Sequence, residues 1–304
     1  MGSAINAPII ILASPRSYTS VVCAMIGQHP GAYGLPEVNL FAHKKLGDFA
    51  EYATLQRQFL LHGLLRAVAE LYSGEQTPET IAMANRWIKA RIERTCGEIY
   101  RELAEKIAPL RLADKSPVYS KRPEALARIE AEFPDTQYLY LIRNPIDQGD
   151  SMLRAQQGFT ELLGNRSLDF SFDPPRVEPQ YEWYKTQTRI LHFLKQIPEK
   201  RKCVLRGEEF TGEPEKNLKA ICGWLGLEWS AEIGSQMMHP ENSPYACVGP
   251  FGAHSGNNPG FQRSPHFRAS DRQPGALDRP LPWREDGFGL KPEVSELARS
   301  FGYV

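Results

Sequence analysis

One stretch of sequence decides the fold, and it reads Ile9-Ile10-Ile11-Leu12-Ala13-Ser14-Pro15-Arg16-Ser17-Tyr18-Thr19-Ser20. Its first five residues are a continuous apolar, β-prone run, as in a strand buried on both faces of a parallel sheet. A hydroxyl-rich turn follows, and a helix is predicted over 21–28. A strand, a turn and a helix in this order are typical of an α/β fold.

Outward from this stretch, predicted strands alternate with predicted helices. The further strands are expected at 32–35, 111–113, 137–142 and 203–205. Apolar residues recur at helical spacing from Ile81 to Leu103 and again from Trp183 to Ile197. A third helix is expected between Pro214 as a start signal and Gly226 as a stop signal. The alternation predicts a three-layer α/β fold with a parallel sheet.

Two regions depart from this alternation. Residues 40–108 form consecutive helical patterns without a strand, which predicts a helical insertion. From about residue 230 to 304, Pro, Gly, His and Asn are frequent and periodicity is poor. A long irregular stretch of this kind is usually a lid or a binding loop. We therefore expect one domain over 1–304, with an insertion and a loop-rich C-terminal cap.

Composition excludes several classes of function. The 304 residues contain 36 basic and 36 acidic side chains, so no global charge attracts nucleic acid. The five cysteines are far apart and form no ligand cluster, so we expect reduced thiols and no metal site. No apolar run approaches the roughly 20 residues of a membrane-spanning helix. We expect a soluble, cytoplasmic protein with no nucleic-acid partner and no membrane span.

The turn after the first strand has the parts of an anion site. A turn that opens a helix gathers free backbone N–H groups at the positive end of the helix dipole. Ser17, Thr19 and Ser20 add hydroxyl donors, and Arg16 adds a charge that can fork around an oxyanion. The alternative is that Ser17 or Thr19 only caps the helix. A GxxxxGK[ST] phosphate loop is absent, which disfavours an ATP-hydrolysing protein.

A second motif, LIRNPIDQGDS, begins inside the predicted strand at 137–142. Asn144 and Pro145 form an ordinary helix start, with Asn144 as the N-cap. Arg143 stands at the carboxyl end of the strand, where α/β folds place ligands. Ser151 follows two helical turns beyond Pro145. Arg143 and Ser151 are therefore candidate binding residues.

Both stretches resemble sequences of the sulfotransferases that use 3′-phosphoadenosine 5′-phosphosulfate (PAPS). The likeness is strongest to the polyketide-synthase-type and carboxylate-base branches of bacteria, and it implies a P-loop-like arrangement of the sheet. By this resemblance Arg143 and Ser151 hold the 3′-phosphate. The residues that it implies at the 5′-phosphosulfate are Arg16, Ser17, Tyr18, Thr19 and Ser20. The family more often has Gly where Tyr18 stands.

Two weaker resemblances lie later in the chain. The stretch from Leu205 to Phe210 is similar to a family stretch that usually reads VRYEDL, although a purely structural strand–turn–helix unit explains it equally well. Residues 258–261, followed by Arg263, resemble a loop that closes over the nucleotide. The resemblance implies that Arg263 contacts the cofactor.

The catalytic residues are expected from the same resemblance. Asp114-Lys115-Ser116-Pro117-Val118-Tyr119 looks like the K[ST]PxY pattern of the branches that use a carboxylate base. Glu37 matches that base, and Lys115 and Arg16 would stabilise the transferring group. On its own, Glu37 would be interpreted as a solvated loop carboxylate. His266 is the alternative base.

The expected activity is transfer of a sulfuryl group from PAPS to a hydroxyl, with PAP as product and no metal, by in-line displacement. The acceptor is expected to be a small molecule, a lipid-like alcohol, or a chain tethered to an acyl carrier protein. Two rival functions remain open. One is a P-loop-type nucleotide kinase or phosphotransferase, and the other is a non-catalytic PAP-binding sensor.

Overall fold

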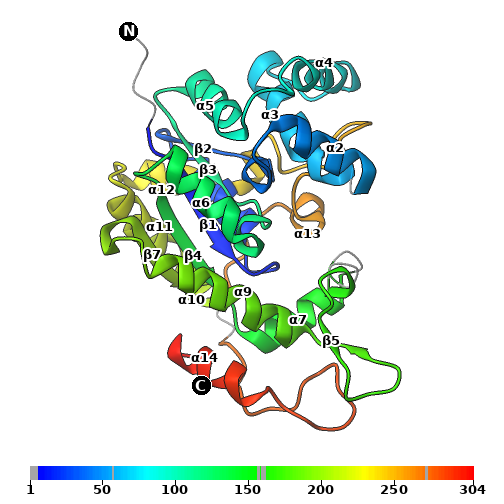
Figure 1. Ribbon diagram of the computed structural model, residues 1–304. Helices are drawn as coiled ribbons and strands as arrows, with labels where there is room; N and C mark the ends of the chain where they lie inside the picture. The colour runs from blue at the N-terminus through cyan, green and yellow to red at the C-terminus, as the bar shows by residue number, and fades with distance from the viewer. Residues whose placement is uncertain (1–5, 57, 156–157, 159–161, 271–272) are drawn as a thin grey trace.

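A parallel sheet of five strands lies at the centre of the molecule (Figure 1). The computed structural model describes residues 6–304 except 57, 156–157, 159–161 and 271–272. The strand order is β2-β3-β1-β4-β7. The strands are β1 (Ile9–Ala13), β2 (Ala32–Gly34), β3 (Arg111–Asp114), β4 (Gln137–Ile142) and β7 (Lys202–Arg206). All five predicted strands are present, with ends that differ by one residue at most.

Alternate residues of β1 face two different hydrophobic cores, and this makes the fold three-layered. Ile10 and Leu12 pack in one core, and Ile9 and Ile11 pack in the other. All four side chains are buried, and each contributes roughly 1.5–3 kcal/mol to folding. The expected α/β fold with helices on both faces of a parallel sheet is confirmed.

The first core is covered by seven helices. They are α2 (Leu46–Gln56), α3 (His62–Ser73), α4 (Pro78–Lys89), α5 (Cys96–Ile107), α6 (Pro123–Glu132), α9 (Pro179–Leu194) and α14 (Pro292–Ser300). The second core is covered by α1 (Thr19–Ile26), α10 (Gly207–Gly212), α11 (Pro214–Leu225) and α12 (Ala231–Met237). Helices α7 (Pro145–Leu153) and α13 (Pro259–Arg263) lie beside them.

The helical insertion differs from its prediction at one point. The apolar pattern from Ile81 to Leu103 is divided between α4 and α5, which are separate helices (Figure 1). The Thr95 side chain accepts a hydrogen bond from Glu98 N, and the Glu98 carboxylate accepts one from Thr95 N. This capping box begins a new helix, which overrides the continuous periodicity. Ile92 lies in the break and is 43% exposed.

Two features of the chain were not predicted. Strands β5 (Leu168–Asp169) and β6 (Arg176–Val177) form an antiparallel pair that is too short to give a period in the sequence. Helix α14 packs against α9, below the sheet in Figure 1. Among the described residues, no helix combines the length and apolarity required to cross a membrane.

Candidate active site

The turn after β1 holds two residues in a left-handed conformation. Arg16 has φ 68° and Tyr18 has φ 64°. A left-handed conformation is uncommon for residues other than glycine, and such strain is concentrated at functional sites. Tyr18 is the N-cap residue of α1, and its side chain makes no capping hydrogen bond. Neither Ser17 nor Thr19 is therefore the N-cap residue, and the first amides of α1 receive no hydrogen bond from the N-cap side chain.

The two predicted phosphate motifs meet at one place. Arg16 Nε donates a hydrogen bond to Ser151 Oγ (3.2 Å), and Arg143 Nη1 donates one to the Arg16 carbonyl oxygen (2.7 Å). Gln148 Nε2 donates to the Pro15 carbonyl oxygen (2.7 Å). Strands β1 and β4 are parallel neighbours, so their carboxyl ends share one edge of the sheet. The adjacency follows from the topology.

A cavity of about 310 Å³ opens at this edge. Its lining comes from the β1–α1 turn, from Arg143 and from two later segments. The lining residues are Arg16, Ser17, Tyr18, Thr19, Ser20, Val21, Arg143, Thr211, Asn258, Gly260, Phe261, Ser264, His266, Phe267 and Arg268. Of these, Thr211, Phe267 and Arg268 carry no motif and were not predicted. Thr211 comes from α10, and Phe267 and Arg268 come from the chain after α13.

The cavity has an excess of positive charge. Burial lowers the pKa of Arg16, and the like charges of Arg143 and Arg263 lower it further. Arg143 Nε is buried and has no hydrogen-bond partner among the described residues. A buried donor without a partner costs roughly 1–3 kcal/mol. A bound anion would satisfy this donor and relieve the repulsion among the three arginines, so the cavity fits a phosphorylated ligand.

Glu37 and Lys115 form an ion pair next to β2 and β3. Lys115 Nζ lies 2.5 Å from Glu37 Oε1, with the lysine side chain 1% exposed and the glutamate side chain 24% exposed. Glu37 N donates to the Gly256 carbonyl oxygen (2.7 Å). Asn39 Nδ2 donates to the Glu37 carbonyl oxygen (3.1 Å). The carboxylate is therefore held rigidly, unlike that of an ordinary surface glutamate.

The residues after β3 support this pair. The buried Asp114 carboxylate accepts hydrogen bonds from Ser116 N (2.9 Å), Ser116 Oγ (2.7 Å) and Tyr119 Oη (2.9 Å). Ser116 Oγ also accepts from Asn39 N (2.9 Å), which connects the segment to the Glu37 loop. Burial raises the pKa of Asp114 to about 6, although these hydrogen bonds and Lys115 oppose the rise.

Helix α1 lies between the ion pair and the cavity. Its residue Cys23 directs Sγ to the carbonyl oxygens of Leu35 (3.6 Å) and Ala113 (3.4 Å). These two residues precede Glu37 and Lys115 by two positions each, while the first turn of α1 lines the cavity. Glu37 and Lys115 are not themselves among the lining residues of the cavity.

The histidines have other surroundings. His266 lines the cavity, but its side chain is 68% exposed and its Nδ1 lies 3.3 Å from Glu241 Oε1. His29 Nδ1 accepts from Gly31 N (2.8 Å), and its Nε2 therefore donates to the Glu228 carbonyl oxygen (2.8 Å). His29 is a structural residue that joins two loops.

The C-terminal segment over 275–304 supports the Arg143 loop. No sequence motif indicated this. Asn144 Nδ2 donates to the Gly275 carbonyl oxygen (2.9 Å), and Arg279 Nη2 lies 2.7 Å from Asp147 Oδ1. Glu208 accepts from Asn144 N (2.9 Å) and from Tyr303 Oη (2.8 Å). The segment over 275–304 therefore fixes the loop from behind. No local pattern in the sequence carries this information.

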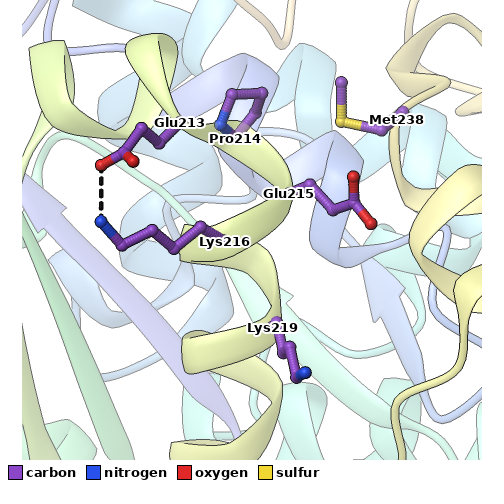
Figure 2. Close-up of a pocket in the computed structure, with 6 residues that line it drawn as sticks. All are labelled: Glu213, Pro214, Glu215, Lys216, Lys219 and Met238. Atoms are coloured by element: carbon purple, nitrogen blue, oxygen red, sulfur yellow. Dashed lines mark hydrogen bonds and ion pairs between the residues drawn. The ribbon is translucent and has the colours of Figure 1, made fainter.

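A second hollow of about 600 Å³ lies at the start of α11 (Figure 2). Figure 2 shows Glu213 paired with Lys216, with Met238 facing them from another segment. Both members of this ion pair are largely exposed, so the hollow is a solvated surface feature. In the part of the chain that the structure describes, no group of three or more His, Cys, Asp or Glu residues could hold a metal ion.

A parallel sheet with an arginine-rich cavity at its carboxyl edge defines a P-loop-like α/β protein. The chain belongs to the sulfotransferase family, because the sequence model of that family matches residues 8–231. A search of curated proteins finds no match.

Solved structures of sulfotransferases resemble the whole chain. A sulfotransferase domain from the curacin biosynthetic pathway is 25% identical, with a TM-score of 0.77 and 99% of each chain covered. A sulfotransferase domain from the Synechococcus PCC 7002 olefin synthase is 23% identical, with a TM-score of 0.73, covering 100% of this chain and 98% of the other. A sulfotransferase from Mycobacterium avium is 16% identical, with a TM-score of 0.51, covering 99% and 78%.

Proposed function

We propose that this sulfotransferase uses PAPS and transfers its sulfuryl group to a hydroxyl of the acceptor. One observation carries the proposal: Arg16 and Arg143 converge with Ser151 beside a positively charged cavity, and Arg143 Nε lacks a partner among the described residues. PAPS carries anionic groups at both its 3′ and 5′ positions, so it needs two such binding groups. ATP and ADP lack the 3′-phosphate.

PAPS supplies an activated sulfuryl group on an anionic leaving group. Arg143 and Ser151 bind the 3′-phosphate. Arg16 and the hydroxyls of the β1–α1 turn bind the 5′-phosphosulfate, with the amides at the start of α1 as further donors. Tyr18 and Arg263 contribute to the same site. These groups position the sulfuryl group and neutralise the charge that develops on the leaving oxygen.

Glu37 is the proposed general base. It accepts the proton of the acceptor hydroxyl as the oxygen attacks the sulfur atom. The buried ammonium group of Lys115 orients the Glu37 carboxylate and places a positive charge near the transferring group. The acceptor must reach both Glu37 and the cavity, which places it along helix α1. His266 is a weaker candidate because its side chain is more exposed.

The proposed acceptor is a hydroxylated small molecule, a lipid-like alcohol or a chain tethered to an acyl carrier protein. The similar domains from the curacin pathway and from an olefin synthase support a role in natural-product biosynthesis. An acidic carrier protein and a soluble alcohol can be distinguished by assay, because only the carrier-dependent reaction requires the acceptor on its protein.

The experiment is thermal unfolding of the protein with PAP, ADP and ATP, for wild type and Arg143→Ala. A ligand at about 100 times its Kd stabilises the native state by about 2.7 kcal/mol, which a melting curve resolves. We expect a shift with PAP that exceeds the shift with ADP and is lost in Arg143→Ala. Arg101→Ala, which removes a surface arginine paired with Glu132, is the matched control and keeps the shift.

The outcomes separate the rival functions. Equal shifts with PAP and ADP would contradict the assignment of Arg143 and favour a kinase or phosphotransferase. A PAP sensor would bind PAP preferentially and would transfer no sulfuryl group to any hydroxylated acceptor. Its function would also be unaffected by Glu37→Gln or Lys115→Met. The sulfotransferase family match disfavours both rivals.

A further inference from the structure

The ring of Tyr18 occupies the space in front of Gly207. A Cβ atom placed on Gly207 would lie 2.3 Å from Tyr18 Cδ2 and 2.8 Å from Tyr18 Cε2. Gly207 begins helix α10 directly after β7, and its φ is not positive. Its backbone would therefore accept any residue, and only the tyrosine ring requires glycine at this position.

The same ring lies against Arg143. The Arg143 guanidinium carbon is 4.8 Å from the ring centroid, within the range of a cation–π contact. The same guanidinium donates a hydrogen bond to the Arg16 carbonyl oxygen. The backbone of Arg143 is fixed separately, because Trp183 Nε1 donates to its carbonyl oxygen (2.9 Å). The ring and the hydrogen bond to Arg16 together determine the direction of the guanidinium.

Tyr18 makes these contacts from an unfavourable backbone conformation. Its φ of 64° would be unstrained for glycine and is strained for tyrosine. The contacts of the ring with Arg143 and with position 207 must offset that strain.

We propose that Tyr18 and Gly207 are a complementary pair that positions Arg143 for the 3′-phosphate. The aromatic ring comes from the β1–α1 turn, and position 207 is kept free of a side chain to receive it. Tyr18 is a positioning residue that acts through Arg143. The assignment of the phosphate rests on the proposed function, whereas the fit between positions 18 and 207 does not.

The test is a cycle of four proteins: wild type, Tyr18→Gly, Gly207→Tyr and the double variant. Melting temperatures without ligand are expected to fall in both single variants and to recover in the double variant, where the ring returns from the other side. The Kd for PAP, measured by calorimetry, is expected to rise about tenfold in Tyr18→Gly. The double variant is expected to return to within about threefold of wild type.

A matched control tests whether the loss of any tyrosine stacked on an arginine would weaken PAP binding. Tyr52 in α2 also lies against an arginine, Arg122, at 5.4 Å, outside the lining of the cavity. Tyr52→Gly is expected to lower the melting temperature and to leave the Kd for PAP unchanged.

The outcomes distinguish this inference from the proposed function. Additive melting effects in the double variant, or PAP binding by Tyr18→Gly within twofold of wild type, would overturn the pairing and leave the function intact. A wild-type protein that does not bind PAP, with rescue still present in the melting temperatures, would contradict the function and support the pairing.

Discussion

Arg16 combines two unfavourable features. Its φ is 68°, and its guanidinium is partly buried beside Arg143 and Arg263, which lowers its pKa. A left-handed conformation costs an ordinary residue roughly 1–2 kcal/mol. Without a ligand, the protein carries both this backbone strain and the repulsion between Arg16 and the two other arginines. A bound anion would offset the repulsion.

Replacing Arg16 with glycine should therefore separate stability from binding. We expect Arg16→Gly to raise the melting temperature by about 2 °C without ligand, a gain of about 1 kcal/mol. Relief of strain and of repulsion outweighs the lost hydrogen bond to Ser151, which contributes roughly 1 kcal/mol. The stabilisation by PAP should be lost in the same variant. A lower melting temperature, measured by scanning calorimetry, would show that the turn is not strained.

The exchange of Glu37 for glutamine tests the general base. The amide keeps the shape of the side chain but cannot accept the proton, so we expect kcat to fall by about 10²–10⁴. The Kd for PAP should stay within about twofold, because Glu37 does not line the cavity. His266→Gln is the companion variant, with kcat expected within about threefold of wild type. A reversed pattern would assign the base to His266.

At the scale of elements, the segment from β3 to Tyr119 connects the sheet to the Glu37 loop. Its centre is the buried Asp114, which accepts hydrogen bonds from Ser116 and Tyr119. Burial raises the pKa of Asp114 to about 6. Because the unfolded chain loses this proton near pH 4, the folded state binds more protons between pH 4 and 6. The contribution of Asp114 to stability is therefore fully present below about pH 4 and decreases as the pH rises to 6.

The direction of this pH dependence of stability can be measured with Asp114→Asn, because the asparagine amide does not titrate. We expect the free energy of unfolding of wild type, relative to this variant, to decrease by up to about 3 kcal/mol from pH 4 to pH 7. Urea unfolding at the two pH values gives the difference directly. A constant or increasing difference would mean that Asp114 is ionised in the folded protein at pH 4.

Helix α3 approaches the Glu37 loop closely enough to require glycine. A Cβ on Gly63 would lie 2.0 Å from the Glu37 carbonyl oxygen, so the helix or the loop would have to move. We expect Gly63→Ala to destabilise the protein by about 1–3 kcal/mol and to lower kcat by displacing the base. Gly223→Ala is the control: it lies in α11 with nothing within 4 Å and should stabilise the protein by roughly 0.5–1 kcal/mol. Equal effects of the two changes would contradict the close approach.

The strands and the two binding motifs could be predicted because their signals are local. The apolar run of β1 and the residues at the ends of β1 and β4 specify the sheet and place Arg16 and Arg143 at one edge. The break between α4 and α5 was missed because a capping box outweighed the apolar period. The strands β5 and β6 were missed because two residues carry no period.

The site could be predicted only in part, because long-range packing brings some of its residues together. Glu37 and Lys115 were expected to act together, and the structure places them in contact. Phe267 and Arg268 reach the cavity through the path of the C-terminal region, which depends on long-range packing. No pattern within the sequence determines that path.

At the scale of the whole molecule, the C-terminal segment over 275–304 supports the Arg143 loop. Trp283 packs against α7 so closely that a Cβ on Gly149 would lie 2.6 Å from its Cη2 atom. Trp283 Nε1 also donates to Glu178 Oε1 (3.0 Å), and Arg279 is paired with Asp147. These contacts connect the segment to α7 and α9, the helices next to Arg143.

Removal of this support should weaken binding at a distance. We expect Trp283→Ala to lower the free energy of unfolding by about 2 kcal/mol and to weaken PAP binding several-fold, because α7 carries Ser151 and begins two residues after Arg143. Phe170→Ala removes an aromatic ring that is 72% exposed. It should change the free energy of unfolding by no more than about 0.5 kcal/mol and PAP affinity by no more than about twofold. PAP titration calorimetry and urea unfolding measure both. Unchanged PAP affinity in Trp283→Ala would show that the segment does not position the site.

Glu208 accepts hydrogen bonds from Asn144 N and from Tyr303 Oη. The second of these can form only at the end of synthesis of the chain. The β1–α1 turn leaves the ribosome early, but the Arg143 loop lacks its final support until residue 303 has emerged. At about 5–20 residues per second, that interval is on the order of tens of seconds. A nascent chain therefore carries the β1–α1 turn long before the Arg143 loop has all of its contacts, and the complete cavity is a late product of its synthesis.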